Sequence, residues 1–156
     1  MELKTIAITS LKPFQRNPRA HPDSAIKKLV KSIETYGWTN PILVNKDMTV
    51  LAGHARLKAA QEMGFKEVPI IILDIPDNYV AGYVIADNRI QDETDWDLPT
   101  LKDLLQELDD GSVNMELTGF DEHEIEMLMT AQYQDPPVPG QPDAKINKCP
   151  ECGYEW

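Results

Sequence analysis

Residues 49–64 read Thr49-Val50-Leu51-Ala52-Gly53-His54-Ala55-Arg56-Leu57-Lys58-Ala59-Ala60-Gln61-Glu62-Met63-Gly64, and the rest of the chain can be organised around them. The opening residues suit a short buried strand. Gly53 then marks a turn at which the backbone approaches another group closely or takes a positive φ angle. Leu57, Ala60 and Met63 recur at helical spacing, and Gly64 fits the position just after a helix. The stretch therefore predicts a strand, a glycine turn and a helix with one buried face.

The first turn of this helix is a candidate anion site. His54 and Arg56 lie where free backbone N–H groups and the positive end of the helix dipole attract anions. An ordinary strand-to-helix connection with a solvated arginine fits the same residues, because a glycine turn alone is a weak motif. His54 is equally open to a role as general base, phosphate ligand or helix cap.

The charge of the chain is distributed unevenly. The 156 residues carry a formal net charge of −11, and their number suits one domain with a tail. Residues 1–70 hold 11 basic and 6 acidic residues, a net of +5, whereas residues 71–156 hold 4 basic and 20 acidic residues, a net of −16. An anionic ligand is therefore expected in the first half, while the acidic half is either a solvated surface or one that repels nucleic acid.

The composition also restricts the compartment. The sequence contains no apolar run of about 18 residues, so no membrane partner is expected. The N-terminus lacks the pattern of a signal peptide, and two cysteines near the C-terminus form no disulfide framework. We expect a cytoplasmic protein.

Hydrophobic periodicity predicts the remaining elements. Strands are expected over residues 3–8, 40–44, 50–52 and 68–73, with a hairpin turn at 45–48. The strand at 68–73 is apolar on both faces and is expected inside the sheet. Helices are expected from Asp23 to Gly37, from Asp77 to Ile90, after the cap Asp97, and after Asp121, which forms a capping box with Glu124.

The order of these features resembles the N-terminal domain of the ParB/sulfiredoxin superfamily. The residues that carry the resemblance are Asn17-Pro18-Arg19, Lys31–Gly37, Asn40–Val44, Ala52–Ala60, Val68–Ile71 and Asp87-Asn88-Arg89. The resemblance implies an α+β fold: a ParB/sulfiredoxin-like small mixed sheet with flanking helices, followed by a helical segment and a short knuckle tail. The expected boundaries are 1–92 for the ParB-like domain, 93–133 for a helical extension, 134–148 for a Pro-rich linker and 149–156 for the tail. This arrangement is similar to proteins of phages and mobile elements.

The resemblance further implies a nucleotide site. Gly53, Arg56 and Ala59 would hold the triphosphate of CTP or another nucleoside triphosphate with Mg²⁺. Asn40–Val44, in particular Pro41 and Ile42, would lie against the base. Asn88 with Arg89 would complete the pocket, and Arg16 and Arg19 are candidate DNA or phosphate contacts.

The sequence departs from the family pattern at several positions. His54 and Ala55 stand where an acidic residue and an arginine are usual, which leaves hydrolysis and the choice of base open. Sulfiredoxin activity needs a cysteine in the glycine turn. No cysteine precedes Cys149, so this activity is not expected. Residues 97–133 offer two acidic helices without a basic recognition helix, which argues against centromere-specific DNA binding.

Cys149 and Cys152 form half of a typical zinc site. Zinc usually takes four ligands, and His21, His54 and His123 show no paired spacing that would supply the others. A site shared across a homodimer, a site completed by another chain, and a metal-free thiol pair all stay open.

Three functions follow as hypotheses. The first is a nucleotide-binding module of a phage type that acts in DNA transactions or their regulation. The second is a ParB-like nuclease, NTPase or phosphotransferase with His54 and Asp87 as catalytic residues and Asp92 and Glu93 as nearby carboxylates. The third is a non-catalytic adaptor that recruits a DNA methyltransferase or packaging protein.

Overall fold

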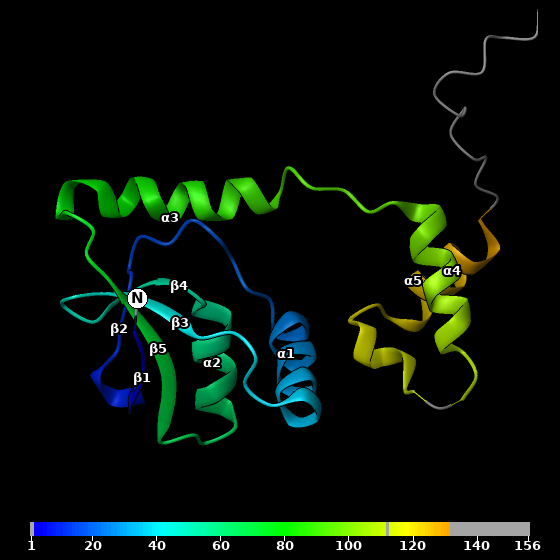
Figure 1. Ribbon diagram of the computed structural model, residues 1–156, viewed down its shortest axis with the longest axis horizontal. Helices are drawn as coiled ribbons and strands as arrows, with labels where there is room; N and C mark the ends of the chain where they lie inside the picture. Colours follow the sequence, from blue (N-terminus) through cyan, green and yellow to red (C-terminus); the bar gives the residue numbers. More distant parts are fainter. Residues whose placement is uncertain (1, 112, 132–156) are drawn as a thin grey trace, which may run out of the picture.

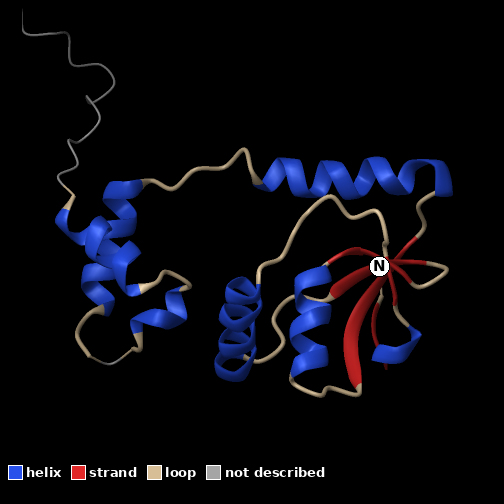
Figure 2. Ribbon diagram, turned by 180° about the vertical axis from the view of Figure 1, so that it is seen from behind, coloured by secondary structure: helices blue, strands red, loops and turns tan. Residues whose placement is uncertain are grey.

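The computed structural model describes residues 2–111 and 113–131. They form a five-stranded sheet with two helices beside it, a third helix across one end, and a smaller helical segment beyond (Figures 1 and 2). The predicted α+β class is thereby confirmed. The Pro-rich linker and the cysteine tail lie outside the described residues.

The elements follow the predicted order. The strands are β1 (Leu3–Ala7), β2 (Lys12–Pro13), β3 (Ile42–Asn45), β4 (Thr49–Ala52) and β5 (Glu67–Leu73). The helices are α1 (Asp23–Tyr36), α2 (His54–Glu62), α3 (Asp77–Gln91), α4 (Leu98–Leu108) and α5 (Glu122–Thr130). Two short 3₁₀ turns, η1 (Ile8–Ser10) and η2 (Met115–Thr118), were not predicted.

The strand order is β1-β5-β3-β4-β2. β3 and β4 form the expected antiparallel hairpin, and β5 lies inside the sheet between an antiparallel neighbour and a parallel one. The sequence did not reveal β2, whose two residues run parallel to the end of β4. A strand this short shows no alternation, so periodicity could not find it.

The main core lies between the sheet and α2. Its buried members are Leu11, Ile42, Val44, Val50, Leu57, Ala60, Val68 and Ile70. Met63, which we expected on the buried face, is only half-buried because α2 ends there. A second cluster joins α3 to β4 through Leu51, Val80 and Val84. Packing therefore fixes α2 and the middle of α3 relative to β4.

The helical segment after α3 lies near α1 through ion pairs. Lys31 pairs with Glu116 at 2.5 Å, and Lys28 pairs with Glu124 at 3.4 Å. Both expected caps are confirmed: Asp97 accepts from the Thr100 backbone N–H, and Asp121 forms the full capping box. None of the helices in residues 2–111 and 113–131 has the length and apolar character of a membrane span.

Candidate nucleotide-binding site

A cavity of about 510 Å³ lies where β3, β4, the start of α2, the C-terminal half of α3 and the loop before α1 meet. Its lining residues are Asn17, Arg19, His21, Leu29, Asn40, Pro41, Leu43, Leu51, Ala52, Gly53, His54, Ala55, Arg56, Asp87, Asn88 and Gln91. Most of the residues quoted for the phosphate site are therefore neighbours in space. The cavity size is typical of sites for small molecules and cofactors.

The turn at Gly53 sets the start of α2 at this cavity. Its φ is +92°, and a Cβ atom built on it would lie 3.4 Å from the Ile42 Cα atom and 3.5 Å from Ile42 Cγ1. No side chain caps the first turn of α2. The described residues thus leave backbone N–H groups of this turn available to a ligand, at the positive end of the helix dipole.

Arg56 lies on the wall of this cavity. Its side chain is half-buried, and it forms no hydrogen bond or ion pair with any residue in the described ranges. Burial lowers the pKa of Arg56, and the negative charge of Asp87 partly opposes this effect. A half-buried guanidinium with unused donors is a receptor for a planar or tetrahedral anion.

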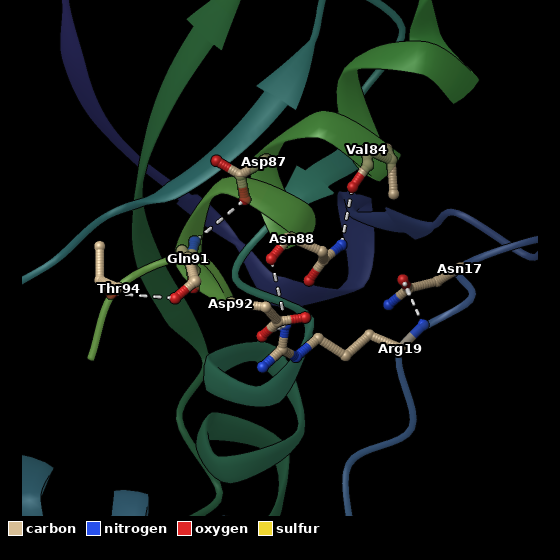
Figure 3. A network of polar contacts seen from close by, with 8 residues as sticks. All are labelled: Asn17, Arg19, Val84, Asp87, Asn88, Gln91, Asp92 and Thr94. Carbon is tan, nitrogen blue, oxygen red and sulfur yellow. Dashed lines mark hydrogen bonds and ion pairs between the residues drawn. The ribbon is translucent and has the colours of Figure 1, made fainter. Parts of the chain in front are cut away.

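Arg19 reaches the cavity from the loop before α1. Its Nη1 atom donates to Asp92 Oδ1 at 2.8 Å and to the Asn88 backbone oxygen at 3.3 Å (Figure 3). The Asn88 side chain donates to the Val84 carbonyl at 2.7 Å within α3. The loop is therefore held against the C-terminal part of α3 by a network that also borders the cavity.

Two histidines face the same space from different elements. His54 is the first residue of α2, and its Nε2 atom is shielded from solvent and has no hydrogen-bond partner among the described residues. Burial lowers the pKa of His54, and the charges of His21 and Lys58 lower it further. Both imidazoles are thus held towards their neutral form while no anion is present.

Four of the proposed nucleotide contacts stand apart from the cavity lining. Ile42 is fully buried beneath Gly53, and Ala59 is fully buried on α2. Arg89 is exposed and pairs with Glu93 at 3.0 Å. Arg16 borders a second, smaller cavity of about 280 Å³ with Asp47 and Asp77. Ile42 and Ala59 contribute shape rather than contacts, because close packing at these positions lets the helix start approach the strand.

Three polar cavity residues were not predicted as nucleotide contacts from the sequence. His21 was weighed only as a metal ligand, and Asn17 and Gln91 were not singled out. The signal was the spacing Asn17-Pro18-Arg19-Ala20-His21 in an extended loop, which places every second side chain on one side. Cys149 and Cys152 lie outside the described residues, and the described ranges hold no group of three or more His, Cys, Asp or Glu that could bind a metal.

The first part of the chain matches a known protein family. Residues 1–89 match the ParB N-terminal domain family. The chain belongs to the ParB N-terminal domain family. Residues 99–152 additionally match the ParB-methyltransferase HTH domain. The lack of a basic recognition helix in residues 97–133 argued against centromere-specific DNA binding, and the second match covers these acidic helices.

Two curated relatives illustrate the range of the family. The chain is 38% identical over 66 residues to the ParB-like nuclease domain-containing protein YnaK of Escherichia coli K12, covering 42% of this chain and 76% of that protein. It is 30% identical over 97 residues to the nucleoid occlusion protein of Bacillus cereus AH187, covering 59% of this chain and 33% of that protein. The ParB-like chain thus spans about a third of the length of the nucleoid occlusion protein.

A solved ParB structure shows the same fold. The C-terminally truncated chromosome-partitioning protein ParB from Caulobacter crescentus, complexed with CTP-gamma-S, superposes with a TM-score of 0.68. The two chains are 23% identical, and the match covers 83% of this chain and 77% of the other. The predicted ParB/sulfiredoxin-like architecture is thereby confirmed.

Proposed function

We propose that this ParB-like chain binds a nucleoside triphosphate, with CTP as the first candidate, in the cavity between α2 and α3. The observation that carries the proposal is the half-buried Arg56 guanidinium, which has no hydrogen-bonding partner among the described residues and lies on the wall of this cavity. It stands beside the uncapped first turn of a helix. A polyphosphate satisfies both sets of donors at once.

The cavity lining offers both charged and less polar groups. Arg19, His54 and Arg56, with the first turn of α2, form the phosphate end. Asn40, Pro41 and Leu43 offer an amide and two apolar surfaces, which suit the edge and the face of a base. Asn88 lines the same cavity, and its amide nitrogen already donates to the Val84 carbonyl. We assign the base to β3 and the triphosphate to the start of α2.

Mg²⁺ fits this arrangement as a companion of the nucleotide. Magnesium usually keeps several waters and is held by one or two carboxylates together with substrate phosphates. Asp87 is the acidic residue among those that line the cavity, so it is the residue that would hold the ion. The ion would neutralise part of the phosphate charge when the nucleotide is bound.

Binding is a better-supported function than catalysis. Of the carboxylates considered for a metal-dependent reaction, Asp92 pairs with Arg19 and Glu93 pairs with Arg89, whereas Asp87 alone lines the cavity. The nuclease and phosphotransferase hypotheses keep His54 and Asp87 as their candidate residues. A plasmid-nicking assay with Mg²⁺ tests the nuclease hypothesis, with Asp87→Asn as the inactive comparison.

We further propose that the chain acts in DNA transactions through a partner protein in the cytoplasm. Residues 92–131 contain thirteen acidic residues and one basic residue. This segment includes α4 and α5, which lie in the region that matches the HTH family. Such a surface repels the phosphate backbone of DNA. A basic protein surface, as on a DNA-modifying or packaging partner, complements it. DNA binding by the full chain at low salt, stronger than that of an acidic control protein, would contradict this part of the proposal.

The zinc half-site at Cys149 and Cys152 stays a prediction. A tetrahedral site shared by two chains requires about one zinc ion per two chains. Elemental analysis of the purified full chain measures this ratio directly, and a clearly lower value would remove the shared site.

Isothermal titration calorimetry of the full chain with CTP, ATP, GTP and UTP, each with Mg²⁺, tests the main proposal. We expect at least one nucleotide to bind with a dissociation constant in the micromolar range, at about −8 kcal/mol. Absence of binding by all four nucleotides at millimolar concentration would reject it.

A further inference from the structure

His54 has an unsatisfied nitrogen at the cavity. Its Nε2 atom is shielded from solvent and has no hydrogen-bond partner among the described residues. Buried polar atoms in native proteins are nearly always bonded. Leaving one unpaired costs about 1–3 kcal/mol. His54 is the first residue of α2 and lines the cavity, so a turn of its ring would bring this nitrogen to a ligand that supplies the missing partner.

His21 brings a second imidazole to the same cavity. It lies on the loop before α1, far from His54 in sequence, and also lines the cavity. The two rings are close enough for the charge of His21 to act on His54. Neither ring makes a hydrogen bond to another residue in the described ranges that would fix its protonation state.

The charged groups that face these rings are mostly positive. Lys58, from the next turn of α2, acts on both histidines, and Arg19 acts on His21. Arg56 stands on the same wall, and Asp87 from α3 is the acidic residue among those lining the cavity. Burial is the largest cause of the lowered pKa of His54 and of His21, and the positive neighbours add to it. Both rings are therefore largely neutral near pH 7 in the free protein.

We propose that His54, together with His21, is a proton-coupled phosphate ligand: when a polyphosphate enters the cavity, the imidazoles take up a proton, and the His54 ring turns so that Nε2–H donates to a phosphate oxygen. The proposal rests on the nucleotide-binding function proposed above. An anion placed against an imidazole favours its charged form. The bound state therefore holds more protons than the free state, and the proton comes from the solvent.

The sign of the pH dependence follows from this linkage. Binding strengthens as the pH falls from above the bound-state pKa towards the free-state pKa, and it is flat outside that interval. The phosphate groups and the arginines do not give this sign. The terminal phosphate of a nucleotide releases its proton when it meets cations, and arginine side chains keep theirs throughout the range. Asp87, which also lines the cavity, would take up a proton with the same sign, so the loss of uptake in the His54→Gln variant is what assigns the effect to the imidazole.

Calorimetry in buffers of different ionisation enthalpy measures this uptake. The full chain is titrated with Mg²⁺–CTP and with inorganic triphosphate between pH 6 and 8.5. We expect a maximum uptake on the order of one proton per ligand, and an affinity that falls by up to about tenfold per pH unit over the coupled interval. Inorganic triphosphate should show the same uptake as CTP, because the coupling involves only phosphate.

Two variants separate His54 from the other histidines. His54→Gln keeps an amide of similar reach but cannot titrate, and we expect it to lose most of the uptake and the pH dependence. His123→Gln on α5 is the matched control, since His123 is exposed and does not line the cavity, and its uptake should equal that of the wild type.

Different outcomes would reject the proton coupling of His54 alone or the proposed nucleotide binding as well. If Mg²⁺–CTP binds with no proton uptake at any pH, or if His54→Gln folds and retains full uptake, the proton-coupled ligand is wrong and nucleotide binding stands. If neither CTP nor triphosphate binds at any pH, and the other nucleotides fail as well, both proposals are rejected.

Discussion

A Cβ atom built on Gly53 would lie 3.4 Å from the Cα atom of Ile42, so the first turn of α2 is held directly against β3. The nearest atom belongs to the Ile42 backbone, and Ile42 Cγ1 would lie at 3.5 Å, so an added methyl group would fill the space between α2 and β3. It sets the distance between the phosphate end of the cavity and the strand assigned to the base. Gly53 therefore serves both the fold and the site.

Replacing Gly53 by alanine should destabilise the protein and weaken ligand binding together. The positive φ alone costs about 1–2 kcal/mol for a residue with a Cβ atom. Gly64→Ala is the matched control, because Gly64 also has a positive φ, of +73°, but open space around it. Urea unfolding should show a larger loss for Gly53→Ala than for Gly64→Ala. Equal losses would mean that the Ile42 contact contributes nothing.

Replacing Arg56 should remove most of the affinity for a nucleotide. A hydrogen bond to a charged group contributes about 1.5–3 kcal/mol, so Arg56→Ala should weaken binding by roughly ten- to a hundredfold. Arg56→Lys should recover only part of this loss, since an ammonium cannot form a bidentate contact. Arg89→Ala is the control, because Arg89 pairs with Glu93 and does not line the cavity. Calorimetry that finds the same loss for both alanine variants would contradict the assignment.

Releasing Arg19 from its present partner should strengthen phosphate binding. Arg19 is shared between Asp92 and any anion that enters the cavity, so Asp92→Asn should raise the affinity for Mg²⁺–CTP several-fold. The exposed ion pair itself contributes only about 0–1 kcal/mol, so the free energy of unfolding should change little. Glu93→Gln is the control, as Glu93 pairs with Arg89 instead. Weaker binding by Asp92→Asn would show that Asp92 supports the site rather than competing for it.

Removing the Asn45 side chain should destabilise the contact between β3 and the segment just before α3. Asn45 is buried, donates to the Ile75 carbonyl at 2.9 Å and accepts from the Ile75 N–H at 3.1 Å. Asn45→Leu leaves two backbone groups unpaired and should cost about 2–4 kcal/mol, as measured by urea unfolding. Asn78→Leu, at an exposed position of α3, should change stability by less than about 0.5 kcal/mol. Similar values for the two variants would show that water replaces Asn45.

Sequence patterns predicted most of the fold because its main elements are long and periodic. The helix from Asp23, the hairpin around residue 47 and the apolar strand β5 each follow from spacing and turn chemistry. The pairing of the two-residue β2 with β4 did not, since it depends on how a proline-containing loop packs against a strand end. Tertiary packing decided what local sequence left open.

The candidate site was predictable only in part. Gly53, His54 and Arg56 share one turn, so local reasoning places them together. His21, Arg19 and Asp87 join them from a distant loop and helix, and sequence spacing carries no information on that meeting. Ile42 and Ala59 belong to the family pattern, yet both are buried. A family pattern includes residues that pack in the core as well as residues that contact a ligand, and the sequence alone does not separate the two.

Two-dimensional ¹⁵N NMR of the full chain during a titration with Mg²⁺–CTP tests the central claim most directly, since it reports both binding and place. We predict saturable shifts of the backbone signals of Gly53, His54 and Arg56 and of Asn88, with much smaller changes on α4 and α5. No saturable shift up to millimolar CTP, or shifts confined to the helices after residue 97, would contradict a nucleotide site at the start of α2.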